Sequence, residues 1–237
     1  LGPCGDGSAR MTAIEIPTLV RQRATHNGAA GSAWLDALPS VVDDLSDRWG
    51  LTIGDAFAGG PAGSVVAAID ANGRDCVLKV AMPLDIDERE TFARSVLAHH
   101  LAAGRGCAAL LAHADEVPAM LLERLGPNLA DLGFTVAQIL DAIADTLPTF
   151  WRPLDDDVEL RTGAEQAQWL ARYIATTWEA LGRPCDRRVI DRAVELCDRR
   201  ADAYSLERSV LVHGDAQGWN TLAAGDGSKT AYACLRD

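Results

Sequence analysis

The segment LVHGDAQGWNTL, residues 211–222, places a histidine, an aspartate and an asparagine at fixed spacing between two short apolar runs. Asp215 follows His213 by two residues, and Asn220 lies five residues after Asp215. A carboxylate in such a loop can accept the proton of an attacking hydroxyl, and an amide oxygen beside it can ligate Mg²⁺. Phosphoryl transfer needs positioning and charge neutralisation more than covalent help. The spacing alone is also compatible with simple turn hydrogen bonds, but it allows phosphoryl transfer with Asp215 as the base and Asn220 as a metal ligand.

The flanking sequence favours this interpretation over a loop whose Asp and Asn make only turn hydrogen bonds. A hairpin is expected after the loop, with residues 219–224 pairing antiparallel to residues 229–236. That pairing would bring Asn220 close to Asp237, the last residue. A second carboxylate ligand for Mg²⁺ is needed about there, so Asp237 is its candidate.

Lys79 lies in the alternating segment DCVLKV, which is typical of a strand. A lysine there can pair with the α- and β-phosphates of a nucleotide, held by a glutamate from the next helix. Glu88 and Glu90 both fall early in that helix, and Glu90 is preferred because it shares a face with Leu97 and Leu101.

A glycine-rich turn, GGPAGSVV at residues 59–66, lies between two expected strands. Gly60, Gly63 and Ser64 in this turn are candidates for nucleotide binding, because glycines let backbone N–H groups approach phosphates closely. The turn is a weak signal alone, since many hairpins carry similar ones.

The remaining pattern predicts a small β-rich lobe followed by a mostly helical lobe. We expect helical turns closed by Gly50, followed by a three-stranded meander over residues 51–81 with an Asn72-Gly73 turn. After the meander we expect a helix over 84–104 and a further strand pair around 108–125. Helices follow over 129–207, with breaks at Leu147-Pro148, at Asp155 to Asp157 and at Gly182 to Pro184, and SVLVHGD is expected as a strand. The expected divisions are an extension at 1–33, a nucleotide-binding lobe at 34–125 and a lobe with the catalytic loop at 126–237.

Composition narrows the classes of partner. The 237 residues carry a formal net charge of −12, which repels nucleic acid and anionic membranes and suits a cationic small molecule. Six scattered cysteines without metal-ligand spacing indicate reduced thiols in a cytoplasmic protein. A monomer is expected. A metallohydrolase built around His213 and Asp215 is disfavoured, because further ligands at suitable spacing are missing.

At this point the chain resembles a known family, the aminoglycoside and hydroxyurea resistance kinases of the streptomycin 6-kinase-like group. LVHGDAQGWNTL is similar to their catalytic loop, LLERL followed by GPNL to their hinge, and residues 178–193 to the helical segment before the loop. The resemblance covers residues 34–237.

The resemblance implies an α+β, two-lobed protein-kinase-like fold with ATP and Mg²⁺ as cofactors. It implies transfer of the γ-phosphoryl group to a hydroxyl of an aminoglycoside such as streptomycin. By position, it implies roles for Asp215 as base, for Asn220 and Asp237 as Mg²⁺ ligands, for Lys79 as phosphate contact, and for backbone groups from Glu123 to Leu125 as adenine contacts.

The chain also departs from this family. Gln217-Gly218 stands where such loops often carry a histidine and a small residue, and Arg236 stands where an apolar strand residue is expected. Residues 1–10, before Met11, are expected to be foreign to the fold, and the helical lobe is expected to be incomplete. Two alternatives therefore stay open: a metabolic kinase of the same fold acting on a small hydroxyl compound or sugar, and a nucleotide-binding fragment without catalysis.

Overall fold

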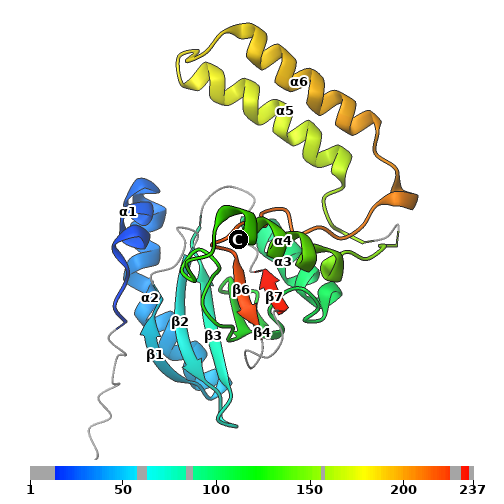
Figure 1. Ribbon diagram of the computed structural model, residues 1–237. Helices are drawn as coiled ribbons and strands as arrows, with labels where there is room; N and C mark the ends of the chain where they lie inside the picture. The colour runs from blue at the N-terminus through cyan, green and yellow to red at the C-terminus, as the bar shows by residue number, and fades with distance from the viewer. Residues whose placement is uncertain (1–13, 58–62, 84–87, 156–157, 225–230, 235–237) are drawn as a thin grey trace, which may run out of the picture. The chain divides into compact units, whose positions relative to one another are not determined.

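The computed structural model describes residues 14–57, 63–83, 88–155, 158–224 and 231–234 (Figure 1). The chain divides into two compact units, which we call unit 1 (Leu1–Phe150 and His213–Asp237) and unit 2 (Trp151–Val212). Unit 1 contains the helices α1 (Thr18–His26), α2 (Gly28–Trp49), α3 (Glu88–Ala102) and α4 (Val136–Phe150). Its strands are β1 (Thr52–Ala56), β2 (Gly63–Ile69), β3 (Asp75–Ala81), β4 (Leu110–Ala114), β5 (Ala119–Glu123), β6 (Thr221–Ala224) and β7 (Ala231–Cys234). Unit 2 contains α5 (Gly163–Ala180), α6 (Arg187–Asp202) and the 3₁₀ turn η1 (Leu206–Arg208).

The main sheet of unit 1 is antiparallel throughout and has the strand order β1-β2-β3-β5-β4. This confirms the expected meander and the expected second strand pair. β6 and β7 form a separate hairpin, in which Thr221 pairs with Cys234 and Ala224 with Ala231. The hairpin after the catalytic loop is therefore also confirmed.

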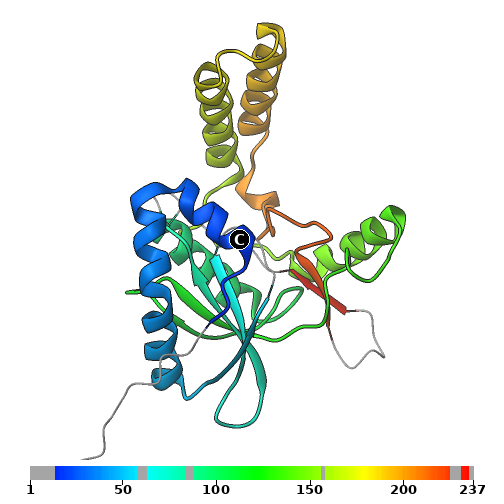
Figure 2. The same cartoon turned by 90° about the vertical axis from the view of Figure 1, so that its left-hand side faces the viewer.

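The two faces of the main sheet are covered by different helices. Even-numbered residues of β3, such as Leu78 and Val80, lie in a buried cluster with α1 and α2, which we call the back face. The odd-numbered Val77 and Ala81 belong to a second cluster with Phe92 and Val96 of α3, which we call the front face. Figures 1 and 2 show α2 running along the sheet. Because side chains alternate along a strand, Lys79 projects from the front face.

Two chain reversals lie where local sequence signals predicted them, after α2 and between β2 and β3. Gly50 ends α2 in the left-handed conformation, at φ 63°, as predicted from its place after Trp49. The β2–β3 turn is also where the Asn72-Gly73 pair predicted it, but its geometry differs. Gly73 has φ 78° whereas Asn72 does not have positive φ, and the Asp70 carboxylate accepts the N–H groups of Asn72 and Arg74. The aspartate thus stabilises a wider turn with a single left-handed residue.

Two expectations about the elements were wrong. SVLVHGD forms only an isolated bridge, Pro153 with Val210, because Pro153 has no N–H with which to extend a ladder. α4 continues through Pro148 to Phe150, whose buried ring anchors the last turn. Residues 14–33, part of the expected extension at 1–33, carry α1 and the start of α2, two helical segments that were not predicted. Val20 and Ala24 of α1 are buried against the back face.

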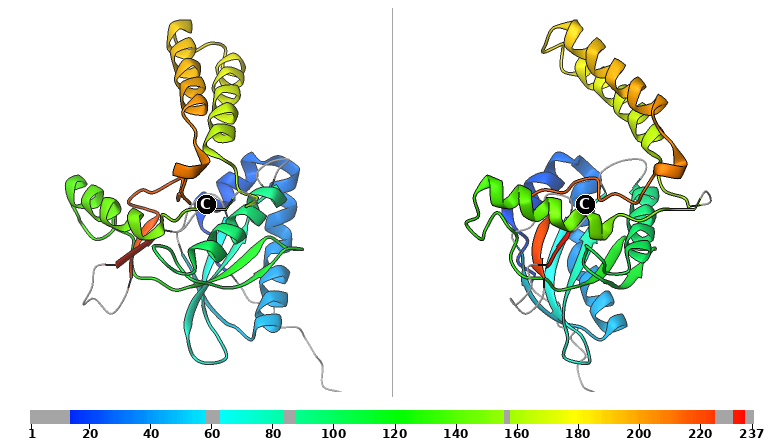
Figure 3. Two further views of the ribbon diagram at one scale, coloured as in Figure 1. Left: turned by 90° about the vertical axis from the view of Figure 1, so that its right-hand side faces the viewer. Right: turned by 45° about the vertical axis from the view of Figure 1, so that its right-hand side comes forward.

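Unit 2 is a helical hairpin, and Figure 3 shows α5 and α6 side by side in both of its views. A capping box between Thr162 and Glu165 starts α5, and the Asp186 carboxylate caps the first turn of α6. The predicted break at Gly182 to Pro184 is confirmed, since α5 ends at Ala180 and α6 begins at Arg187. In the described residues, no helix is both long and apolar enough to cross a membrane.

Candidate active site

Residues 213–220, which we call the catalytic loop after their predicted role, are anchored by the segment that follows β5. Ala130 N donates to Gly218 O, Leu129 N to Thr221 O, and Ala223 N to Pro127 O. Gly126 N donates to Ala223 O, and an added Cβ at Gly126 would lie 3.1 Å from that oxygen. The segment 126–130 therefore runs as an antiparallel neighbour of β6 and fixes the end of the loop.

His213 supports the loop from inside unit 1. It is 1% exposed, and its ring meets the ring of Phe150 edge-on at a centroid distance of 5.9 Å. The backbone N–H of Asp215 donates to His213 Nδ1 at 3.2 Å. Nδ1 is therefore the unprotonated ring nitrogen in this arrangement, and His213 sets the direction of the Asp215 backbone.

The structure brings Asp215 and Asn220 together. Asn220 Nδ2 donates to Asp215 Oδ2 at 2.8 Å and to the Asp215 carbonyl at 3.1 Å. Gln217 Nε2 lies 3.3 Å from the same carboxylate oxygen, and Gln217 O accepts the Asn220 N–H. The exposed carboxylate is thus held between two amide side chains, with its oxygens directed by the loop itself.

The donor set at this point suits Mg²⁺, because carboxylate and amide oxygens are the protein ligands that hard cations prefer. Asn220 supplies the amide oxygen, and its amide nitrogen donates to the neighbouring carboxylate of Asp215, the predicted base. Asp237, the other predicted ligand, lies outside the described residues. Within the described ranges, no three His, Cys, Asp or Glu side chains are grouped to hold a metal.

Lys79 lies at the centre of the main sheet, where it pairs with Val65 of β2 and Met120 of β5. Its side chain is half-buried. Neighbouring strands on both sides therefore fix its backbone, and the strand directs its amine to the front face.

The described part of the glycine-rich turn is tightly packed. Gly63 pairs with Ala81, and an added Cβ would lie 2.4 Å from Val80 O, so the position accepts only glycine. Ser64 is 1% exposed, and its Oγ has no hydrogen-bond partner among the described residues. Gly60 falls outside the described residues.

Glu90 forms an ion pair with Arg94 one turn along α3, and its side chain is 56% exposed. The side chain of Glu88 is not among those described. The pairing of Lys79 with a glutamate from this helix therefore stays a prediction.

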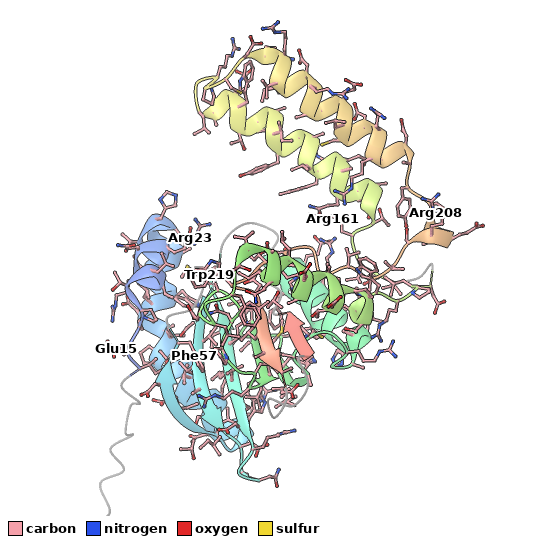
Figure 4. The ribbon with its side chains drawn as sticks, in the orientation of Figure 1. Glu15, Arg23, Phe57, Arg161, Arg208 and Trp219 are labelled. Carbon is pink, nitrogen blue, oxygen red and sulfur yellow. The ribbon has the colours of Figure 1, made fainter. Side chains whose placement is uncertain are left out.

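The residues predicted to form the hinge, Glu123 to Leu125, have separate environments. Glu123 N donates to Ala109 O, and the Glu123 carboxylate accepts the Ala109 N–H, so this residue binds β5 to the start of β4. Leu125 packs against the front-face cluster. Arg124 lies with its guanidinium carbon 5.5 Å from the centre of the Phe57 ring, which is labelled in Figure 4.

Thr221 is a structural residue of the site that the sequence did not reveal. It is 0% exposed, and its Oγ1 donates to Gln217 O at 2.9 Å. Trp219, the residue before Asn220, is 63% exposed (Figure 4). The burial of Thr221 could not be predicted from the residues next to it, because the segment that packs against it is residues 126–130.

Comparison with known proteins places this geometry in context. No family model matches the chain. The chain is 28% identical over 221 residues to a streptomycin 6-kinase of Streptomyces glaucescens, a match that covers 89% of this chain and 66% of the relative. It is 34% identical over 217 residues to a hydroxyurea phosphotransferase of Kitasatospora aureofaciens, covering 89% of this chain and 60% of the relative.

The sequence relatives support an aminoglycoside phosphotransferase-like family. This confirms the resemblance predicted from the catalytic loop and hinge. The chain spans between about three fifths and two thirds of the length of these two relatives.

A solved structure supports the fold independently. The choline kinase of Cryptosporidium parvum superposes with a TM-score of 0.50 at 11% identity, covering 79% of this chain and 57% of that one. The match supports the predicted α+β, two-lobed kinase-like fold.

Proposed function

We propose that the protein is an ATP-dependent phosphotransferase that moves the γ-phosphoryl group to a hydroxyl of an aminoglycoside such as streptomycin. The observation that carries this proposal is the 2.8 Å contact between Asp215 and Asn220 on a loop fixed by His213. A carboxylate and an amide in this arrangement serve as base and metal ligand in phosphoryl transfer.

Each residue would have one task. Asp215 would accept the proton of the acceptor hydroxyl, and the neighbouring amides of Gln217 and Asn220 would hold its carboxylate in place. Lys79, fixed on both sides by β2 and β5, would bind the α- and β-phosphates. Asn220 would ligate Mg²⁺, which neutralises phosphate charge when it is bound.

The nucleotide base would meet the hinge. In the described part of the chain, the backbone N–H and C=O of Leu125 make no hydrogen bond. Glu123 already bonds Ala109 through its N–H. Leu125 is therefore the better-placed of the two predicted residues for a backbone contact with adenine.

The choice of acceptor rests on charge and on the relatives. A net charge of −12 favours cationic acceptors, which aminoglycosides are. The relatives are named for streptomycin and for hydroxyurea, so both compounds are the acceptors to test.

The test is mass spectrometry of streptomycin, other aminoglycosides and hydroxyurea after incubation with the chain and MgATP. We expect streptomycin to gain one phosphoryl group. Asp215→Asn should lower turnover by about 10²–10⁴-fold, because the base is lost while the shape is kept. Asp115→Asn makes the same chemical change at an exposed aspartate in the β4–β5 turn and should leave turnover unchanged.

Full activity of Asp215→Asn would show that another group is the base. A product on hydroxyurea alone would replace the aminoglycoside with the second acceptor. Absence of product on every acceptor, together with tight MgATP binding, would support a nucleotide-binding role without transfer.

A further inference from the structure

The end of β3 is held from the back face, opposite to Lys79. Met82, just beyond the strand, is 1% exposed and lies in the same buried cluster as Val20 and Ala24 of α1. Leu78 and Val80 belong to this cluster too, on either side of Lys79. Packing of β3 on the back face therefore fixes the backbone position from which Lys79 projects on the front face.

Asn27, the residue between α1 and α2, connects these helices to the end of β3. Its Nδ2 donates to Pro83 O at 3.1 Å and lies 3.6 Å from Met82 Sδ. Its backbone N–H is itself bonded to Arg23 O and Ala24 O, both at 3.1 Å. The end of α1 thus fixes the direction from which the Asn27 side chain reaches β3.

Among the described residues, the last pair of the β2–β3 ladder is Gly63 with Ala81, two residues before Pro83. Pro83 has no N–H to donate, so its carbonyl is the group through which it can be anchored. Asn27 supplies that anchor four residues after Lys79.

The two helices that carry Asn27 are locked together. An added Cβ at Gly31 of α2 would lie 1.9 Å from Ala24 O of α1, closer than any side chain can approach backbone. The absence of a side chain at Gly31 lets the helices meet and places Asn27 at their junction.

We propose that Asn27 is a positioning residue for Lys79: the α1–α2 junction fixes the end of β3 and so the place where the lysine meets nucleotide phosphates. The role in nucleotide binding rests on the proposed function, whereas the anchoring of β3 does not. A small displacement of a phosphate-binding group is costly, since binding and transfer depend on geometry at the ångström scale.

The test compares Asn27→Asp with the wild-type chain. Aspartate keeps the shape of asparagine but loses the N–H donor, so a residue that only fills space would tolerate it. Asn27→Ala removes both. Thr25→Ala is the matched control, because the Thr25 hydroxyl donates within α1, to Arg21 O, two residues before Asn27.

The first measurement is amide exchange of the peptide spanning residues 75–83 in the ligand-free chain. We expect both Asn27 variants to speed exchange there by about fivefold, the effect of losing one hydrogen bond, while Thr25→Ala leaves it unchanged. Unchanged exchange in Asn27→Asp would overturn the anchoring.

The second measurement separates nucleotide from acceptor. In a chain that transfers phosphate, Asn27→Asp should raise KM for ATP by about fivefold, again one hydrogen bond, and leave KM for streptomycin unchanged. An equal rise in both constants, or in neither, would overturn the link to Lys79. A wild-type chain that does not bind MgATP would refute the proposed function, and the exchange result would still decide whether Asn27 anchors β3.

Discussion

The two units of the chain are stabilised in opposite ways. Unit 1 buries side chains from segments far apart in sequence: Val20 and Leu38 share a cluster with Leu78 and Leu121. In unit 2, the buried apolar residues of the described chain are Ala167, Trp178, Cys197 and Leu211. Its surface carries local i,i+4 ion pairs such as Arg187–Asp191 and Arg183–Glu179, each of which adds a small contribution to its own helix or turn.

This difference matches what each unit must do. The residues proposed for catalysis and phosphate binding, Asp215, Asn220 and Lys79, all lie in unit 1, where long-range packing fixes them. In unit 2, Trp178 is covered by the guanidinium groups of Arg183 and Arg187, each 5.3 Å from the ring. A site that needs fixed distances is thus built on the part of the molecule with the larger shared core.

The largest effect should come from the core of unit 1. Leu78 is 0% exposed at the back face, so Leu78→Ala should lower the free energy of unfolding by about 2–5 kcal/mol. Urea unfolding would measure this loss, and amide exchange would locate it in the main sheet. Leu181→Ala, at a side chain 67% exposed in unit 2, should change stability by less than about 0.5 kcal/mol.

Equal losses of exchange protection in β3 and in α5 after Leu78→Ala would contradict the comparison. Such a result would mean that the two units unfold together, as a single cooperative structure.

A smaller effect should be confined to unit 2. Thr162→Ala removes the capping box of α5 and should cost about 1 kcal/mol. Thr162→Ser keeps the hydroxyl that accepts the Glu165 N–H and is the matched control. Amide exchange of α5 should rise in the alanine variant alone. A rise in the main sheet of similar size would show that the helix is not stabilised locally.

The contrast between local and long-range stabilisation also explains what the sequence could predict. Gly50 as a helix end and Asn72-Gly73 as a chain reversal were predicted, because each depends on its own backbone. α1 was missed because its role depends on burial of Val20 and Ala24 against a distant sheet. The extent of SVLVHGD was wrong for the same kind of reason, since its partner Pro153 lies outside the segment.

The candidate site divides in the same way. The five-residue spacing of Asp215 and Asn220 placed them in one loop, and the structure has them in contact. The support from residues 126–130 could not be predicted, because it pairs segments about ninety positions apart. The choice between Glu88 and Glu90 as the partner of Lys79 stays a prediction, and Glu90 also forms an ion pair with Arg94 on its own helix.

The smallest effect should be the pH dependence of the α6 cap. Hydrogen bonds from the Arg188 side chain and backbone hold the pKa of Asp186 below its ordinary value of 3.8. Because the pKa of Asp186 is lowered in the folded chain, its charged carboxylate stabilises α6 when the pH is above the ordinary pKa of 3.8. This stabilisation is lost as the pH falls through the lower pKa of the folded chain. Asp186→Asn keeps a good capping side chain but removes the charge, so it isolates the electrostatic part.

We expect the wild-type chain to be slightly more stable than Asp186→Asn at pH 7, and the two to become equal as the pH falls below 3.8. Amide exchange of α6 in the two chains, measured across that range, would follow the difference. Added salt should also reduce it, because the pair is exposed to solvent. A difference that persists at low pH would instead place the stabilisation in the geometry of the cap, and local charge would then have a smaller part in holding unit 2 than its ion pairs suggest.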